Sequence, residues 1–457
     1  MNKTGKYIAY LFFSLFTFLA FMASCTAENE PEKLISPGDK ISLSISFHSA
    51  QQTKTQNGLR ANEGGEIGED VFARESKIYS LAVLIFENSG DKLAGYKFID
   101  RTIKTDGLGD KDYNLLTEIK EITLTAGKRD VYIIANAPDK TFSRDETRTS
   151  FQEKLESLAN QKVYAPGVQA NEEESPIGGV EPAVTHTNLV MSQSFPGLDL
   201  TGAKKHYLGY GSNEHSDGIT LTDPVKLVRL VARVAIQKIS FALPTEVAFE
   251  SGIKTQKYNH YIDTVFLINA KTASSYFPRE TNFPVVTAPF GHGSYWWYKF
   301  FKDNKLTAPD AQFADYLSIP INFSSYDIEN NQVPLWFYTF ENSDSETYPT
   351  AFIIGVKYQY INPGESVVKV KKAYYPVVIN SNGGGPEDNK HRYIKRNNQY
   401  GLKVTIKGVG NLIAGYITKS ALSRMTDILS AQEESGVLEV EETVGSNLFP
   451  WGGDVYK

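Results

Sequence analysis

Apolar and polar residues alternate strictly between residues 41 and 47 of this chain. In an extended backbone the apolar side chains share one face and the intervening serines share the other. The apolar set is Ile41, Leu43, Ile45 and Phe47. The pattern predicts a β-strand with one face suited to a protein core, and a second apolar strand is predicted over 78–86.

A polar, glycine-rich run over 51–70 joins these two strands. It contains Gly58-Leu59-Arg60-Ala61, so a trypsin-like protease could cut it. Arg74 is a competing cut site, but it lies closer to the second strand and is expected to be less accessible. The arrangement suits a protein that loses its first strand.

Strand patterns recur along most of the chain. They fall at 93–99, 121–125, 131–137, 225–236, 261–269, 335–340, 352–360, 367–379, 399–407 and 437–444, with a turn at 127–130 and a return to the core at 188–192. Residues 225–236 also have arginines at helical spacing, Arg229 and Arg233, but their β-branched content favours a strand. These patterns predict a mainly β protein with two antiparallel β-sandwich-like (transthyretin-like) domains.

Two short helices interrupt the strands. A capping box at Ser150–Glu153 and apolar residues at helical spacing predict a helix over 150–160, which should cover the sheet. A second helix is predicted over 420–434. The acidic, proline-containing stretch 163–181 is expected to be a long loop.

The N-terminus reads as an export signal. Lys3 and Lys6 precede an apolar run that is too short to span a membrane, and the run ends in Met22-Ala23-Ser24-Cys25. Small residues before a cysteine resemble a bacterial lipobox, and Cys25 is the only cysteine of the 457 residues. We therefore expect a signal peptide over 1–24 and a lipid on Cys25 that holds the precursor in the outer membrane.

Composition narrows the class of protein. A net charge of −6 argues against a nucleic-acid partner, and the 26 Tyr, 26 Phe and 35 Gly favour β structure with many turns. The length suggests two domains, and Asp223-Pro224 is the expected boundary. The expected division is a propeptide over 25–60, domains over 61–223 and 224–436, and a C-terminal segment over 437–457.

The sequence contains no recognisable catalytic or metal-binding motif. The seven histidines lack metal-ligand spacing, and P-loop, dinucleotide and nucleophile-elbow motifs are absent. We therefore expect no enzyme activity, no metal and no cofactor, although a β-sandwich hydrolase with a hidden carboxylate pair remains an alternative. The acidic stretch 106–112 reads as a surface turn rather than a calcium loop, and the aromatic run 295–298 as part of a sheet rather than an exposed binding platform.

Several of these features together resemble the fimbrillins of the type V pilus of anaerobic oral and gut bacteria. They are the lipobox at Cys25, Gly58-Leu59-Arg60-Ala61 ahead of a strand, and residues 131–137, 225–234, 396–400 and 438–451. The resemblance implies a lipoprotein precursor that an arginine-specific protease cuts after Arg60, so that the mature chain begins at Ala61.

The resemblance also implies assembly with other copies of the chain and with other fimbrial subunits. The C-terminal strand of one subunit fills the groove that the first strand of its neighbour has vacated. Candidate donor residues are Leu438, Val440, Val444, Leu448, Phe449 and Trp451. Glu442 interrupts the apolar face of the first three, so the register of the donor stays open.

The leading hypothesis is thus a structural subunit of a cell-surface fimbrium that serves adhesion to a host or bacterial surface receptor. The alternative is a surface lipoprotein, or a tip or anchor subunit, that does not polymerise and binds a glycan or protein through residues 295–298.

Overall fold

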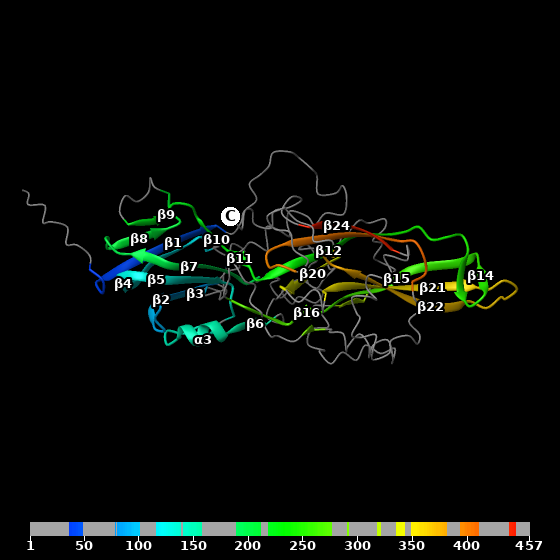
Figure 1. The fold of residues 1–457 in the computed structure, drawn as a ribbon, viewed down its shortest axis with the longest axis horizontal. Helices are drawn as coiled ribbons and strands as arrows, with labels where there is room; N and C mark the ends of the chain where they lie inside the picture. The colour runs from blue at the N-terminus through cyan, green and yellow to red at the C-terminus, as the bar shows by residue number, and fades with distance from the viewer. Residues whose placement is uncertain are drawn as a thin grey trace, which may run out of the picture.

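The computed structural model forms an elongated molecule built almost entirely of β-strands (Figure 1). It describes residues 36–48, 78, 80–100, 116–138, 140–157, 189–211, 218–276, 290–291, 318–320, 335–342, 349–381, 394–410 and 438–444. The predicted mainly β sandwich class is confirmed. The predicted loop 163–181, the helix 420–434 and the acidic stretch 106–112 lie outside the described residues.

Two sheets face each other in the N-terminal half. The first has the order β10-β1-β8-β9, with β4 also paired to β1, and the second has the order β11-β7-β5-β2-β3. The bounds are β1 Lys40–His48, β2 Ser80–Glu87, β3 Leu93–Asp100, β4 Glu118–Thr125, β5 Gly127–Ala135, β7 Met191–Leu200, β8 Lys205–Leu208, β9 Ile219–Leu221, β10 Val225–Lys226 and β11 Val228–Arg229. Apolar residues from both sheets form one core cluster between them.

The C-terminal half repeats the two-sheet plan. One sheet has the order β20-β12-β23-β24 and the other β19-β15-β21-β22, with small pairs β13–β14 and β16–β18. The bounds are β12 Val231–Phe241, β13 Val247–Glu250, β14 Ile253–Thr255, β15 Lys257–Ile268, β16 Ala270–Lys271, β18 Phe290–Gly291, β19 Ser318–Pro320, β20 Leu335–Phe340, β21 Ala351–Ile361, β22 Lys369–Val378, β23 Gln399–Ile406 and β24 Leu438–Val444.

Most strand pairs are antiparallel, as predicted, but four are parallel. β1 runs parallel to β8 and β10, β8 to β9, and β12 to β23. The predicted strand 225–236 is divided into β10, β11 and β12. Pairing partners change at Leu230, since β10 and β11 pair with β1 and β7 whereas β12 pairs with β20 and β23.

One short pair joins the two halves. β6, Leu155–Ser157, continues from the N-terminal half and pairs antiparallel with β17, Ala273–Ser275, of the C-terminal half. Glu156 and Ser274 are opposite each other in this pair, and both are fully buried.

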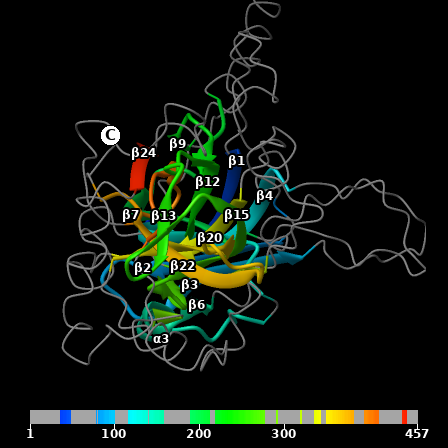
Figure 2. The same cartoon turned by 90° about the vertical axis from the view of Figure 1, so that its right-hand side faces the viewer.

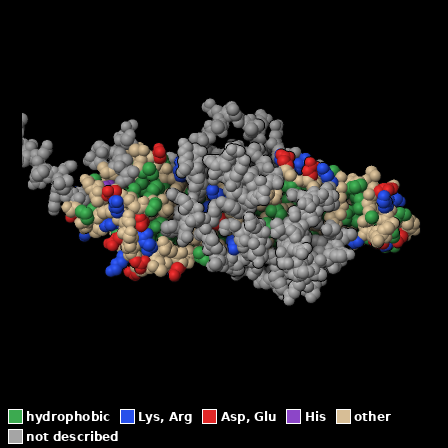
Figure 3. Space-filling view, viewed as in Figure 1, with side chains coloured by type: hydrophobic (Ala, Val, Ile, Leu, Met, Phe, Trp, Pro, Cys, Tyr) green, Lys and Arg blue, Asp and Glu red, His purple; other side chains and the backbone are tan. Residues whose placement is uncertain are grey.

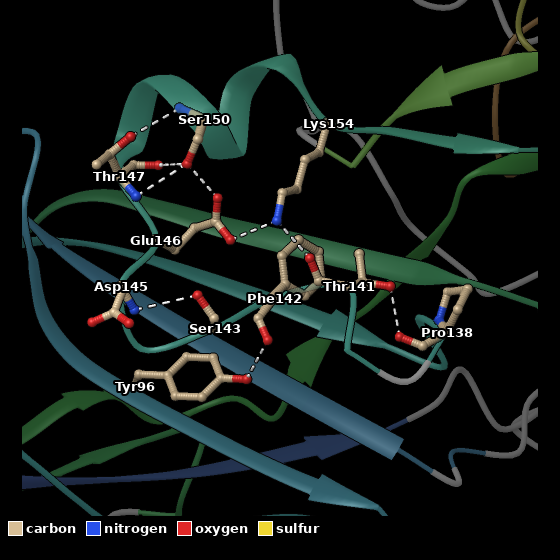
Figure 4. Close-up of polar contacts among 10 residues, drawn as sticks. All are labelled: Tyr96, Pro138, Thr141, Phe142, Ser143, Asp145, Glu146, Thr147, Ser150 and Lys154. Carbon is tan, nitrogen blue, oxygen red and sulfur yellow. Dashed lines mark hydrogen bonds and ion pairs between the residues drawn. The ribbon is translucent and has the colours of Figure 1, made fainter.

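The predicted helix 150–160 is wrong in its bounds. The observed helix, α3, spans Arg148–Glu153, and Thr147 caps it by accepting a hydrogen bond from Ser150 N at 3.0 Å. Lys154 leaves the helix and its ammonium group bridges the Glu146 carboxylate and the Thr141 carbonyl, each at 2.6 Å (Figure 4). The chain then enters β6, because its backbone pairs with β17 rather than with the preceding helical turn.

The predicted role of this helix is confirmed. Phe151 of α3 is buried, and its ring lies 5.1 Å from that of Tyr132 and 5.9 Å from that of Phe86, on β5 and β2. Leu155, predicted to share the buried face, is instead exposed on β6. The turn predicted at 127–130 is also wrong, since Gly127 already begins β5 and only Ala126 separates it from β4.

Candidate functional site

β1 is an inner strand of its sheet. It pairs antiparallel with β4 from Lys40 to Ser46 on one edge and parallel with β8 and β10 on the other. The backbone N–H of Phe47 donates to Thr117 O at 3.0 Å, and that of Ser42 to Lys204 O at 2.9 Å. Removal of β1 would therefore leave two unpaired strand edges facing a gap one strand wide.

The inward face of β1 is fully buried. Ile41 is 3% exposed and Leu43, Ile45 and Phe47 are 0% exposed. They share a core cluster with Leu81, Val83 and Ile85 of β2. This confirms the face that the alternation predicted.

The opposite face of β1 contains one buried polar contact. The hydroxyl of Ser44 accepts a hydrogen bond from Glu121 N at 3.2 Å. Glu121 has a φ of 55°, and the β1–β4 register shifts beside it, between Leu43 and Ile45. The bulge in β4 thus places the backbone N–H of Glu121 within hydrogen-bonding distance of the Ser44 side chain of β1.

Two residues of the groove were not predicted. Gly209, just after β8, has a φ of +83°, and a Cβ there would lie 2.3 Å from Ser46 O. His206 on β8 lies opposite Leu43, is buried, and has its Nε2 3.0 Å from Ala203 O. Burial lowers the pKa of the His206 imidazole, and the Ala203 carbonyl opposes that shift. No local sequence signal marks Gly209 or His206 as a groove residue, because each is next to β1 only in the folded structure.

β24, which contains the first candidate donor residues, is paired with its own subunit. It runs antiparallel to β23 from Ile406↔Leu438 to Tyr400↔Val444 and forms the edge of its sheet. Leu438 is 4% exposed within the core, and Val440 packs against the same cluster. On the other face Glu439 and Glu441 pair with Lys407 and Lys403, where charged side chains gather (Figure 3).

A buried polar network lies at the junction of the two halves. Arg396 forms two hydrogen bonds with the Glu341 carboxylate and donates to Ser274 and Ser275 of β17. Next to it, Asn397 accepts a hydrogen bond from Arg229 N at 3.2 Å through its side chain. The stretch 396–400, which contributed to the resemblance and precedes the predicted strand 399–407, therefore links β11, β12 and β17.

The remaining candidate residues lie outside the described part of the chain. They are Cys25, Arg60, Ala61, Leu448, Phe449, Trp451 and the aromatic run 295–298. Within the described ranges, no group of three or more His, Cys, Asp or Glu side chains could hold a metal ion. No helix among those same residues has the length and apolarity needed to cross a membrane.

Comparisons with known proteins relate the chain to fimbrial subunits. It is 26% identical over 407 residues to a Parabacteroides distasonis protein assigned as fimbrium tip subunit Fim1C, with 88% of each chain covered. It is 22% identical over 423 residues to the major fimbrium subunit FimA type-2 of Porphyromonas gingivalis, with 88% of this chain and 91% of the relative covered.

The fold is also shared. A crystal structure of a protein described as a cell adhesion protein from Parabacteroides distasonis superposes with a TM-score of 0.54 at 20% identity, covering 92% of this chain and 99% of that one. The family model described as major fimbrial subunit protein (FimA) matches residues 41–229, the span from the apolar face of β1 to the last residue of β11. Residues 41–229 of the chain thus match the family of major fimbrial subunit proteins, and the chain is similar to fimbrial subunits over most of its length.

Proposed function

We propose that this chain is a fimbrial subunit that polymerises by strand exchange and serves adhesion. The precursor is exported as a lipoprotein on Cys25 and reaches the outer membrane. An arginine-specific protease cuts after Arg60, β1 is lost, and the C-terminal segment of a neighbouring subunit fills the groove. The role is structural rather than catalytic.

The position of β1 carries this proposal. It is an inner strand whose four inward side chains are buried, and the segment after it contains Arg60 before the chain reaches β2. A cut there would separate β1 from the body without breaking any described strand.

The energetics favour refilling of the groove. Four buried side chains contribute about 1.5–3 kcal/mol each, or roughly 6–12 kcal/mol together. A whole domain is stable by only about 5–15 kcal/mol. The cut subunit is therefore driven to accept another strand, and a donor from a second subunit gives a head-to-tail contact that does not close.

The test is Arg60→Ala in the native bacterium, with Arg74→Ala as a matched control. We expect Arg60→Ala to leave folded, lipidated precursor at the surface without polymers, while Arg74→Ala forms normal fimbriae. The N-terminus and intact mass of sheared wild-type material should show a chain that starts at Ala61 and has no lipid. Normal polymers from Arg60→Ala would overturn the proposal.

A second candidate is a subunit at the fimbrial tip. It is favoured by the assignment of the Parabacteroides distasonis relative as a tip subunit. Immunogold labelling separates the two roles, because a stalk subunit labels the full length of the fimbria and a tip subunit labels only the distal end.

A further inference from the structure

One face of the sheet that contains β15, β21 and β22 is open to solvent at the distal end of the C-terminal half. This end is on the right in Figure 1 and faces the viewer in Figure 2. The pair β13–β14 covers the core-facing side of the three strands there, where the ring of Phe249 stacks on that of Tyr360 with centroids 4.5 Å apart. Side chains on the opposite side, the outer face, are exposed or half-buried and can therefore meet a partner.

Six side chains form two rows across this outer face. Alternation along each strand directs them to the same side, and the strand register sets them opposite one another. The first row is Asn259, Gln359 and Val370, and the second is Tyr261, Lys357 and Lys372. Tyr261 positions two of its neighbours, because Lys357 Nζ lies 5.6 Å from its ring centroid and Gln359 Nε2 donates to its hydroxyl at 3.4 Å.

Positive charge gathers on the outer face although the whole chain has a net charge of −6. Lys357 and Lys372 are directly opposite on neighbouring strands, and like charges in that arrangement cost stability. Lys257 adds a third cation on the same face of β15, and neither row contains an acidic residue. On the core-facing side, by contrast, Lys369 pairs with Glu250 of β13 at 3.2 Å. The outer face is therefore complementary to an anionic partner.

The neutral side chains of the outer face favour a polysaccharide as that partner. Asn259 and Gln359 are directly opposite, and their amides can both donate to and accept from sugar hydroxyls. Val370 is 52% exposed and Val368, two residues earlier, is 56% exposed, so C–H groups of a sugar ring can pack on them. Peptides are commonly bound at a strand edge or in a groove, whereas these rows cross the flat face of a sheet.

We propose that the outer face binds a linear anionic polysaccharide. The three lysines contact its acidic groups, the two amides contact its hydroxyls, and Val370 packs on its C–H groups. The proposal names a partner for the adhesion described above and rests on that function for its role at the cell surface. Binding itself requires neither cleavage nor polymerisation, because the outer face and β1 lie in different halves of the chain.

The first test is binding of the purified full-length precursor to immobilised chondroitin sulfate. Uncharged dextran and poly-glutamate are the comparison probes. We expect binding to chondroitin sulfate and much weaker binding to the other two. Equal binding to dextran would overturn the role of charge, and equal binding to poly-glutamate would overturn the polysaccharide in favour of an acidic protein.

Lys357→Gln with Lys372→Gln tests the lysines. The variant removes two opposed like charges, so it should fold at least as well as the wild type. Its affinity for chondroitin sulfate should fall about tenfold, the change expected from the loss of two exposed ion pairs. Lys403→Gln with Lys407→Gln removes the same charge from another exposed surface and should bind nearly as the wild type. Equal losses in the two variants would mean a general attraction to polyanions and would overturn the proposal.

Asn259→Ala with Gln359→Ala tests the amides without changing the charge. This variant should also bind chondroitin sulfate more weakly, and unchanged binding would overturn the assignment of the hydroxyl contacts. Both outer-face variants should form normal fimbriae in the native bacterium, and a loss of fimbriae would assign the face to contacts between subunits instead. Polymers from Arg60→Ala would overturn the proposed function but leave binding of the polysaccharide by the precursor unaffected.

Discussion

Arg396 and Glu341 form a buried ion pair with two hydrogen bonds, Nε to Oε2 at 2.7 Å and Nη2 to Oε1 at 2.5 Å, and each side chain is 4% exposed. Arg396 also donates to the Ser275 carbonyl at 3.1 Å. Because Ser275 is on β17, which pairs with β6 of the N-terminal half, the ion pair supports one of the contacts between the two halves of the subunit.

Breaking this pair should destabilise the subunit strongly. Arg396→Met leaves the Glu341 carboxylate buried without its cation, so we expect a loss of about 3–5 kcal/mol in the free energy of unfolding. Lys403→Met, which breaks the exposed pair with Glu441, should cost at most about 1 kcal/mol. Urea unfolding of the purified precursor measures the loss of stability in each variant. Equal losses for Arg396→Met and Lys403→Met would contradict a stabilising role for the buried ion pair.

Cleavage after Arg60 should remove the contribution of β1 to the free energy of unfolding of the subunit. Leu43→Ala removes a fully buried side chain, so the uncut precursor should lose about 2–5 kcal/mol of stability. After cleavage and loss of β1, the variant and the wild type are the same molecule and should unfold identically. A stability difference that persists in the polymer would mean that β1 is retained.

Gly209→Ala should be more damaging than Gly202→Ala. The two glycines have nearly the same backbone, with φ of +83° and +81°, so the left-handed strain of about 1–2 kcal/mol is common to both. Only at position 209 does a Cβ meet Ser46 O at 2.3 Å, whereas position 202 has nothing within 4 Å. The difference in precursor stability therefore measures how closely β8 approaches β1, and equal destabilisation would contradict that close contact.

The precursor should lose stability as the solution is acidified. His206 has a lowered pKa in the folded state, so below about its unfolded value of 6.5 the unfolded chain binds more protons than the native one. The stability that the neutral His206 side chain provides is therefore fully present above pH 6.5. It is lost as the pH falls through 6.5 towards the pKa of His206 in the folded state. Denaturation midpoints measured between pH 8 and pH 5 should therefore fall less steeply for His206→Gln than for the wild type.

The sequence predicted much of the local structure, and most clearly the strand in which apolar and polar residues alternate. The alternation over 41–47 predicted β1 and its buried face, because a period of two leaves no other way to bury four apolar residues of a strand together. Strand patterns in the sequence also located β3, β15, β20, β21, β22 and β23 to within a few residues. Lipidation at Cys25 and cleavage at Arg60 stay predictions from the sequence alone.

Local signals were insufficient where distant backbones compete for the same residues. The capping pattern Ser150–Glu153 predicted a helix to residue 160, but Thr147 provides the cap and pairing with β17 draws residues 155–157 into a strand. Likewise, residues 225–236 carry a strand pattern throughout, yet three sheets divide them.

Only the tertiary structure decided the partners. That β1 is an inner strand, that β24 is already paired with β23, that Gly209 must lack a side chain, and that Arg396 meets Glu341 all follow from segments far apart in the chain. The alternation of a strand specifies which face is buried, but its backbone N–H and C=O groups are the same at every residue. The sequence therefore predicted a strand that could be lost. The packing of the sheets determined which strand edges, those of β4, β8 and β10, its loss would expose.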